Sequence, residues 1–321
     1  MRVLSLFDGI SVGRVALQRA GIRIDEYYAS EIDKNAIAVA KYNFPDTKFI
    51  GDVRNIDGNK FKGIDLLIGG SPCQNFSFIG LKQGMITKTQ IEVTTLEQYL
   101  KLKSEGFEFD GQSYLFWEYV RILREAQPKW FLLENVRMAK KWKKVISDTL
   151  GVKPVMINSA LVSAQNRRRL YWTNIPISGL PEDKGIIIKD ILEDEVDEKY
   201  FINKPFKYLP EKPGFIIDPY NKRNVENGKA TTLRTNYSNG NCWINERFKE
   251  NSASNLRKLK IRKLTPLECE RLQTLPDNYT RFGNFDGKIK KISKTQRYKM
   301  IGNAWTADVL AWIFSHLTKK Q

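Results

Sequence analysis

One cysteine stands in a tight turn directly after an apolar run, in the segment 69–74 (GGSPCQ). A thiol at this place is accessible, whereas most isolated cysteines are small core hydrophobes. The only histidine, His316, lies close to the end of the chain, so a Cys-His couple is disfavoured. The turn therefore indicates that Cys73 is a nucleophile whose thiolate is supported by cationic neighbours or by the substrate.

A carboxylic acid and a pair of arginines offer further chemistry. Glu134 ends the apolar run 131–133 (FLL), and burial there favours a protonated or hydrogen-bond-donating carboxyl group. The segment 165–169 reads QNRRR. On a strand, Gln165, Arg167 and Arg169 would share one face and direct two guanidinium groups at one place. A salt-bridged surface strand is the alternative interpretation.

Acidic residues follow each of the first three expected strands, at Asp8, Glu31 and Asp52. The first turn lacks the G-x-G-x-x-G spacing of dinucleotide-binding proteins. Glu31 is placed to accept hydrogen bonds from two ribose hydroxyls, and Asp52 to accept one from an adenine amino group. Acids at all three turns favour a cationic nucleoside without phosphates, such as S-adenosylmethionine. Each acid alone could instead be a turn residue or a helix cap.

These groups form a coherent set for methyl transfer to cytosine. A thiolate that attacks C6 makes C5 a carbanion-like nucleophile, and a buried acid at N3 stabilises that state. C5 then takes the methyl group and loses its proton as the thiolate leaves.

The chemistry requires strand ends that meet along one edge. We expect strands at residues 3–7, 25–30, 48–50, 64–68 and 129–133, and helices at 12–20, 36–42 and 113–125. This alternation predicts an α/β fold with a parallel, doubly wound sheet, which binds ligands at the carboxyl ends of its strands. From about residue 176 the chain is rich in Pro, Gly and Asn, which predicts a smaller, loop-rich domain. Helical signals return at 265–272, where Thr265 and Glu268 match a capping box around Pro266, and at 305–317.

The charge is strongly basic and unevenly distributed. The 321 residues include 53 Lys and Arg against 36 Asp and Glu, a net charge of +17. Residues 255–300 hold 13 basic and 4 acidic side chains, whereas residues 1–100 are nearly balanced with 12 and 11. Such a distribution favours a polyanionic partner such as nucleic acid, and a solvated basic surface is the alternative.

Three cysteines without a CxxC pair exclude a disulfide framework and disfavour a metal site. No apolar run approaches the roughly 18 residues of a membrane span, and the sequence opens without a signal-peptide pattern. We therefore expect a cytoplasmic protein without a metal or a membrane partner, and separately we expect a monomer.

At these residues the chain closely resembles the DNA (cytosine-5)-methyltransferases of bacterial or phage type, over nearly its full length. The blocks stand in the family's order, and together they are far more specific than any one of them. They are Phe7-Asp8-Gly9, Glu31, Gly51-Asp52-Val53, Pro72-Cys73-Gln74, Glu134-Asn135-Val136, Gln165-x-Arg167-x-Arg169, Arg262-Lys263-Leu264-Thr265-Pro266 with Arg271-Leu272-Gln273, and Gln296-x-Tyr298-Lys299 with Gly302-Asn303.

The resemblance implies a role for each block. Cys73 would attack C6, Glu134 would engage N3 and the amino group, Arg169 would hold O2, and Arg167 would position Glu134. It implies a Rossmann-like class I methyltransferase sheet, and a base flipped out of duplex DNA. S-adenosylmethionine, which leaves as S-adenosylhomocysteine, would contact Phe7, Asp8, Gly9, Ser11, Glu31, Ile32, Asp52, Val53 and Asn303.

Three features depart from the usual pattern. Ser11 replaces the second glycine of F-x-G-x-G, and Ile32 replaces the aromatic residue that often follows the ribose acid. The segment 80–111 is longer than simple bacterial members need. It is expected either to touch DNA, through 87–89 and 101–103, or to be a disordered excursion.

The resemblance also implies two functional domains. Residues 1–175 with 290–321 would bind the cofactor and carry catalysis, and residues 176–289 would recognise the target. Arg suits guanine edges and Asn suits adenine edges, although phosphate contact or loop packing is the alternative for these side chains. The expected DNA contacts are Gln74, Gln165, Thr232, Arg234, Asn236 and Tyr237.

Two other functions share part of this evidence. A tRNA cytosine-5 methyltransferase would carry a Cys-Phe-Thr tripeptide, and Cys242-Trp243 does not reproduce it. A catalytically inactive DNA-binding homologue would have no chemical reason to keep Cys73, Glu134 and Arg169 together. Double-stranded DNA is therefore the expected partner, with a cognate restriction endonuclease as a possible second one in a restriction-modification system.

Overall fold

A computed structural model describes residues 1–72, 85–202, 209–210, 214–234, 242–246 and 260–317. The chain divides into two compact units. Unit 1 comprises Met1–Ile157, Arg168–Leu180 and Leu310–Gln321, and unit 2 comprises Asn158–Arg167 and Pro181–Val309. Residues 290–309 thus group with unit 2 by compactness, although the sequence assigned them to the catalytic domain. The functional division into two domains stays a prediction.

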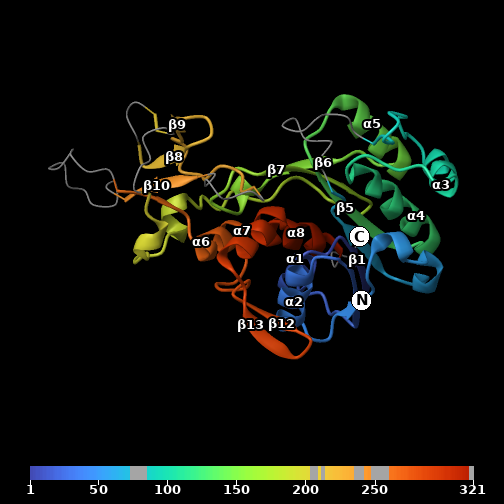
Figure 1. The fold of residues 1–321 in the computed structure, drawn as a ribbon, viewed down its shortest axis with the longest axis horizontal. Coiled ribbons are helices and arrows are strands. Elements are labelled where there is room, and N and C mark those ends of the chain that lie inside the picture. Colours follow the sequence, from blue (N-terminus) through green and yellow to red (C-terminus); the bar gives the residue numbers. More distant parts are fainter. Residues whose placement is uncertain (73–84, 203–208, 211–213, 235–241, 247–259, 318–321) are drawn as a thin grey trace. The chain divides into compact units, whose positions relative to one another are not determined.

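Unit 1 is built around a seven-stranded sheet in the order β3-β2-β1-β4-β5-β7-β6 (Figure 1). Its strands are β1 (Arg2–Leu6), β2 (Glu26–Ser30), β3 (Lys48–Phe49), β4 (Leu66–Gly69), β5 (Trp130–Val136), β6 (Val155–Asn158) and β7 (Arg168–Thr173). Its helices are α1 (Val12–Arg19), α2 (Lys34–Asn43), α3 (Leu96–Ser104), α4 (Phe116–Ala126) and α5 (Lys140–Leu150), and α8 (Ala307–Phe314) continues into it from unit 2. Short 3-10 turns lie at η1 (Val53–Asn55), η2 (Gly58–Phe61), η3 (Ser113–Leu115) and η9 (Ser315–Leu317).

The sheet is mixed rather than wholly parallel as predicted. Strands β1 to β5 run parallel, but β5 pairs antiparallel with β7, with Glu134 opposite Tyr171 and Val136 opposite Arg169. Strands β6 and β7 are neighbours in the sheet. The connection 159–167 that joins them is shorter than the crossover of about a dozen residues that parallel neighbours need, so β7 reverses the direction of the chain. The α/β, doubly wound class itself is confirmed.

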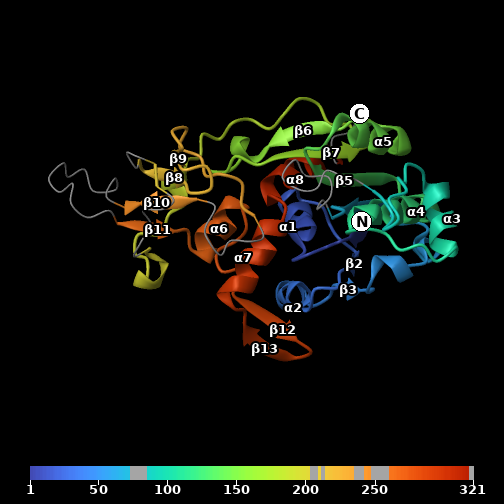
Figure 2. The same cartoon turned by 45° about the horizontal axis from the view of Figure 1, so that its top comes forward.

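Helices cover both faces of this sheet (Figures 1 and 2). The helices α1 and α2 lie on one side, and α3, α4 and α5 lie on the other. On the second side one apolar cluster joins Leu4 of β1 and Leu133 of β5 to Trp117 of α4 and Ile146 of α5. Strand β5 is buried along its length except at its two ends, as expected of a central strand.

The segment after residue 85 is folded, and the expectation of a disordered excursion is wrong for its described part. Thr95 caps α3 by accepting a hydrogen bond from Gln98 N at 3.1 Å. Leu96, Tyr99 and Leu102 recur at helical spacing and are buried in the cluster of unit 1. The segment is therefore held to the sheet by the side of α3 that packs on α4.

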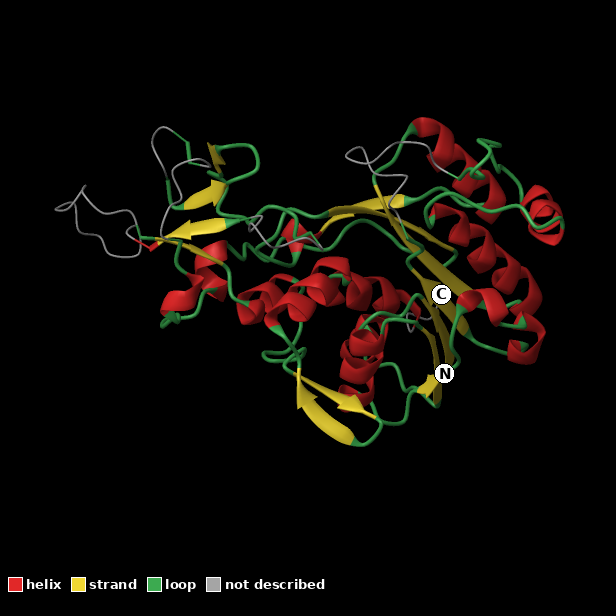
Figure 3. Cartoon of the chain, viewed as in Figure 1, coloured by secondary structure: helices red, strands yellow, loops and turns green. Residues whose placement is uncertain are grey.

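Unit 2 consists of short strands joined by long loops (Figure 3). Its elements are β8 (Ile216–Asp218), β9 (Arg223–Asn224), β10 (Trp243–Asn245), β11 (Ile261–Lys263), α6 (Pro266–Leu272), β12 (Phe282–Phe285), β13 (Lys288–Lys291) and α7 (Lys294–Asn303), with 3-10 turns at η4 (Ser159–Leu161), η5 (Ile188–Ile191) and η6 (Glu198–Tyr200). The first four strands form one antiparallel sheet in the order β11-β10-β8-β9, and β12 pairs with β13. The predicted capping box is confirmed, because Thr265 and Glu268 bond each other's backbone N–H groups at the start of α6.

Candidate active site

The first strand end forms a loop with left-handed backbone. Phe7, Gly9 and Ser11 have φ angles of 57°, 59° and 58°. Only glycine adopts this region without steric cost, so surrounding contacts must hold Phe7 and Ser11 in place. For Ser11 the side chain of Asp8 supplies such a contact: it accepts hydrogen bonds from Ser11 Oγ and, at 2.7 Å, from Tyr27 Oη.

Asp8 and Ser11 are buried, with 4% and 0% of their surface exposed. Burial raises the pKa of Asp8 to about 6, and the hydrogen bonds from Ser11 and Tyr27 oppose that rise. Both side chains therefore shape the loop from within. Their contact with the cofactor, which the resemblance implies, stays a prediction. Tyr27 was missed by the sequence analysis, because only the fold brings it beside Asp8.

The second strand end carries Glu31, which joins two loops. One carboxylate oxygen accepts from Gly9 N at 2.8 Å, and the other accepts from Ile32 N and Asp33 N at 2.8 Å each. A carboxylate has about four lone-pair positions, so a further hydroxyl can still be accepted. Next to it, Ile32 exposes 64% of its surface, an apolar side chain open to a ligand.

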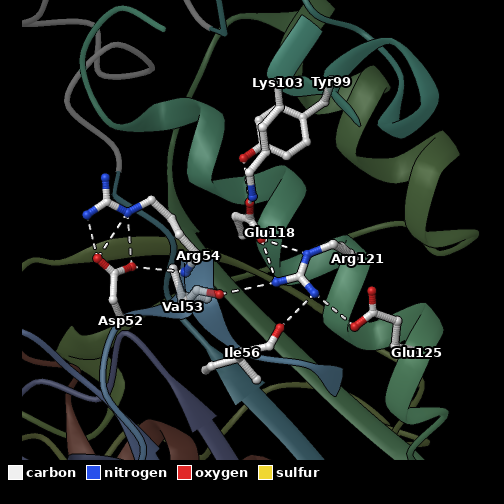
Figure 4. A network of polar contacts seen from close by, with 9 residues as sticks. All are labelled: Asp52, Val53, Arg54, Ile56, Tyr99, Lys103, Glu118, Arg121 and Glu125. Carbon is white, nitrogen blue, oxygen red and sulfur yellow. Dashed lines mark hydrogen bonds and ion pairs between the residues drawn. The ribbon is translucent and has the colours of Figure 1, made fainter. Parts of the chain in front are cut away.

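The third strand end places Asp52 as the cap of η1. Its carboxylate accepts from Arg54 N at 2.9 Å and from the Arg54 guanidinium (Figure 4). Because the Arg54 side chain donates to it, the pKa of Asp52 lies below its ordinary value. Ser30 Oγ donates to the carbonyl of Gly51 at 2.8 Å and so ties this turn to the end of β2.

The three turns together fit a cationic nucleoside. They present the carboxylates of Glu31 and Asp52 and the apolar Ile32 along neighbouring strand ends. The backbone at Gly9 is open, since nothing lies within 4 Å of the position that a Cβ would take. Two carboxylates would repel a phosphate, whereas they attract a sulfonium-bearing ligand whose ribose and adenine offer donors.

Glu134 and Arg169 meet on adjacent strands. Arg169 Nε lies 2.9 Å from Glu134 Oε1, and only 14% and 11% of the two side chains is exposed. Glu134 lies inside β5, because the strand runs two residues beyond it to Val136 rather than ending at residue 133 as expected. The antiparallel β7 directs Arg169 back toward the same carboxylate.

The same strand is tied to the turn that precedes Cys73. Asn135 Nδ2 donates to Ser71 Oγ at 3.1 Å and to its carbonyl at 3.3 Å, and both residues are buried. Cys73 and Gln74 lie outside the described residues. Asn135 was quoted with its motif but given no role, and its place directly after Glu134 was the available signal.

The alternation predicted that Gln165, Arg167 and Arg169 lie on one strand. This prediction is wrong, because β7 begins at Arg168 and contains only Arg169 of the three. Arg167 is 4% exposed and donates to the carbonyls of Leu233, Gly302 and Ala304 at 3.0–3.2 Å. A guanidinium carries five N–H donors, so one side chain can anchor several carbonyls. The role of Arg167 toward Glu134, which the resemblance implies, stays a prediction.

Gln165 is fully buried, with its amide bonded within unit 2. It donates to the carbonyl of Leu272 at 3.1 Å and accepts from Leu233 N at 2.9 Å. This side chain has no exposed surface in this structure, and its contact with DNA stays a prediction. It holds the start of the segment that leads to Arg234.

The remaining recognition candidates are only partly described. Thr232 Oγ1 donates to the carbonyl of Asn166, and Asn236 and Tyr237 lie outside the described residues. The Arg234 guanidinium lies over the ring of Tyr220, 4.7 Å from its centroid. Tyr220 is 66% exposed and was missed by the sequence analysis, although an aromatic residue in the polar turn 218–223 was a visible signal. Asn303 is exposed at the end of α7, and its contact with the cofactor stays a prediction.

Other kinds of site find no support in the described part of the chain. No group of three or more His, Cys, Asp or Glu is arranged there to hold a metal ion. No helix among those residues is long and apolar enough to cross a membrane. The single histidine, His316, is 5% exposed and lies edge-on to Trp312.

Comparison with solved structures gives the fold. The structure matches the DNMT2 protein of Spodoptera frugiperda with a TM-score of 0.68, covering 99% of both chains at 19% identity. It matches the methyltransferase EhMeth of Entamoeba histolytica with a TM-score of 0.69, covering 99% and 97% at 16% identity. These likenesses show the fold, which is that of the methyltransferases.

The sequence comparisons then give the family. The description "C-5 cytosine-specific DNA methylase" matches residues 1–319, so the chain belongs to this family. The chain is 30% identical over 332 residues to the type II methyltransferase M1.ScrFI of Lactococcus lactis subsp. cremoris, covering 94% of this chain and 74% of that protein. It is 27% identical over 459 residues to the orphan methyltransferase M.SPRI of Bacillus phage SPR, covering 99% and 97%. The chain is a DNA cytosine-5 methyltransferase, as the sequence predicted.

Proposed function

We propose that Cys73, Glu134 and Arg169 carry out methyl transfer to C5 of a cytosine flipped from duplex DNA, with S-adenosylmethionine as the donor. The observation that supports this most is the Glu134–Arg169 pair on adjacent strands, tied through Asn135 to the turn before Cys73. Glu31, Ile32 and the turn Asp52–Val53 would hold the cofactor, which supplies the methyl group as an electrophile. Phe7 and the Gly9 backbone would line the same edge.

The proposed steps balance without a histidine. The Cys73 thiolate forms a bond to C6, and the electron pair of the C5–C6 double bond moves toward C5 and N3. Glu134 donates a hydrogen bond or proton at N3, and Arg169 holds its carboxyl group through Nε. The other N–H groups of that guanidinium can reach O2 of the base. After C5 has taken the methyl group, water takes the C5 proton, and the electron pair of that C–H bond re-forms the C5–C6 double bond. The C6–S bond breaks with its electron pair going to the sulfur of Cys73, and the N3 proton returns to Glu134.

Recognition is assigned to residues 176–289. Arg234 and Tyr220 together offer a planar cation on an exposed aromatic ring, a surface suited to base edges or phosphates. Thr232, Asn236 and Tyr237 remain proposed contacts of the same segment. A monomer stays proposed. A cognate restriction endonuclease is proposed because one relative is named a type II methyltransferase.

Bisulfite sequencing tests the activity and the target together. A plasmid from a methylation-free host that expresses the chain should show protected cytosines in one short recurring context. The absence of protected cytosines, with soluble protein present, would contradict the DNA activity, and transfer RNA would then be assayed as the substrate.

Trapping on 5-fluorocytosine DNA tests the nucleophile. The wild type should form a covalent adduct in the presence of S-adenosylmethionine, and Cys73→Ala should form none while still binding DNA. Cys242→Ala is the matched control, since Cys242 is fully buried and burial raises the pKa of its thiol to about 12. An adduct with Cys73→Ala would overturn the assignment.

A further inference from the structure

A fully buried carboxylate on α4 joins two segments that are far apart in the sequence. Glu118 is 0% exposed. It accepts hydrogen bonds from Tyr99 Oη and Lys103 Nζ of α3, at 2.5 Å each, and from Arg121 Nε at 2.8 Å (Figure 4). A buried carboxylate needs such partners, because an unpaired one would be neutralised by a raised pKa.

Arg121 connects this carboxylate to the turn that carries Asp52. Its Nη1 donates to the carbonyl of Ile56 at 2.8 Å, and its Nη2 donates to the carbonyl of Val53 at 3.2 Å. These two carbonyls lie at the start of η1 and directly after it, and Asp52 caps that turn. The guanidinium thus holds this turn against α4 through hydrogen bonds to two of its carbonyls (Figure 4).

The next residues of the chain are held by the same helix. Glu125 Oε2 accepts from Arg121 Nη1 at 2.8 Å and from Gly58 N at 2.7 Å. A Cβ at position 58 would lie 2.7 Å from Glu125, so only glycine permits this approach. The segment from Val53 to Gly58 therefore follows α4 closely, and its position depends on the ion pairs of that helix.

The other side of Glu118 leads to the segment after residue 85. Tyr99 and Lys103 stand one helical turn apart on α3, and both donate to the same carboxylate oxygen. Arg121 Nε and Nη2 approach the second oxygen, at 2.8 and 2.7 Å. One oxygen of this carboxylate therefore bonds to α3. The other bonds to Arg121, which in turn binds the turn that Asp52 caps.

We propose that Glu118 and Arg121 are positioning residues that hold the turn Asp52–Ile56 for the adenine end of S-adenosylmethionine, and that α3 tunes cofactor affinity through Tyr99 and Lys103. This inference rests on the proposed binding of that cofactor by Asp52 and Val53. It gives the extra segment after residue 85 a role in cofactor binding rather than in DNA contact.

Titration calorimetry with S-adenosylhomocysteine, on variants whose folding is first verified by circular dichroism, tests the role of Arg121. Arg121→Lys keeps the charge beside Glu118 but cannot reach both carbonyls, so the Kd should rise about tenfold, the equivalent of one hydrogen bond to a charged group. Arg124→Lys is the matched control: it makes the same change one turn further along α4, where Arg124 forms an exposed pair with Glu97. Its Kd should stay within about twofold of the wild type.

A second ligand separates positioning from general loosening. S-inosylhomocysteine lacks the adenine amino group that is proposed to donate a hydrogen bond to Asp52. Arg121→Lys should weaken binding of S-adenosylhomocysteine much more than binding of this analogue. In methylation assays the KM for S-adenosylmethionine should rise while kcat at saturation stays within about threefold of the wild type. Equal loss for both ligands, or no loss at all, would overturn the role of Arg121.

The contribution of α3 has its own pair of variants. Lys103→Met and Tyr99→Phe each remove one donor to Glu118, and both should raise the Kd for S-adenosylhomocysteine several-fold. Lys101→Met on the same helix is the control, since Lys101 is exposed and faces Glu105 at 3.8 Å. Unchanged affinity in both α3 variants would contradict the coupling through Glu118.

The proposed function and this inference fail differently. If wild-type protein binds no S-adenosylhomocysteine, or if Asp52→Ala binds it as well as the wild type, the assignment of the cofactor site is wrong. If wild-type binding depends on Asp52 but not on Arg121, only the positioning role is wrong.

Discussion

Each unit of the molecule contains a fully buried glutamate paired with an arginine, and the two pairs serve different purposes. In unit 2, Glu268 accepts both Nη groups of Arg262 at 2.7 and 2.8 Å and also the N–H groups of Thr265 and Glu193. In unit 1, Glu118 accepts hydrogen bonds from Tyr99 and Lys103 of α3 and from Arg121. Arg121 also donates to the carbonyls of Val53 and Ile56.

The difference lies in where the second partner of the arginine sits. Arg262 also donates to a second acid, Glu246, and to the adjacent carbonyl of Lys263. The cluster therefore joins the start of α6 to the sheet that contains β10 and β11. Arg121 instead holds a turn at the edge where we place the cofactor. A pair of this kind thus stabilises the fold in unit 2, and we propose that the pair in unit 1 positions a turn for the cofactor.

The largest expected effect comes from breaking the pair of unit 2. Arg262→Met leaves Glu246 and Glu268 without their cation in a buried place, which should cost about 3–5 kcal/mol of the free energy of unfolding. Hydrogen exchange followed by mass spectrometry should show lost protection at residues 260–273 and unchanged protection at β1 and β4. Equal loss in both units would contradict the separation drawn here.

A double variant sharpens the same comparison. Arg262→Met with Glu268→Gln removes both charges of the central pair but keeps a side-chain oxygen that can accept from Thr265 N or Glu193 N. The double variant should recover part of the lost stability, since no uncompensated charge remains at position 268. In unit 1 the corresponding pair of changes, at Arg121 and Glu118, should not restore cofactor affinity, because the carbonyls of Val53 and Ile56 would still lack a donor.

A third buried carboxylate, Asp8, has hydroxyl partners in place of a cation, and this sets its response to pH. Its folded-state pKa of about 6 lies above the ordinary value of 3.8, so the folded state binds the proton more tightly than the unfolded state. Stability should therefore fall as the pH rises from about 4 to about 6, by about 3 kcal/mol in total.

Asp8→Asn removes that titration. Urea unfolding of both proteins at pH 4.5, 5.5 and 7 should show the variant losing less stability than the wild type across this range. Parallel pH profiles for the two proteins would refute the assignment to Asp8.

The smallest effect is expected from an exposed pair beside the Glu118 cluster. Arg124 and Glu97 join α4 to α3 with 53% and 70% of their side chains exposed, and their Nη1–Oε1 distance is 2.7 Å. Arg124→Ala should cost about 0.2–1 kcal/mol, because solvent screens such pairs. A larger loss of stability, measured by thermal unfolding, would mean that the α3–α4 contact depends on the exposed Arg124–Glu97 pair and not on Glu118.

Much of the fold and of the candidate site could be predicted from local patterns. The strands that end near Phe7, Ser30 and Gly69 follow from short apolar runs closed by glycine or an acid, and the capping box at Thr265 follows from spacing alone. The β5 boundary was placed too early, since Glu134 and Asn135 are polar residues paired inside the sheet by β7. A helix after residue 85 was missed because the segment was judged by length and charge, although Leu96, Tyr99 and Leu102 already had helical spacing.

The sequence by itself determined which acids follow the first three strands, Asp8, Glu31 and Asp52, and which residues are the candidates for catalysis, Cys73 and Glu134. Side-chain type and the periods of strands and helices are local properties, so one chain suffices to read them. Only the tertiary structure decided the partners of these groups. Asp8 meets Tyr27 within the core, Glu134 meets Arg169 across β5 and β7, and Gln165 is buried under Leu272. Such contacts join residues up to 107 positions apart, and burial, which sets pKa values and access to ligands, arises only when those distant segments pack together.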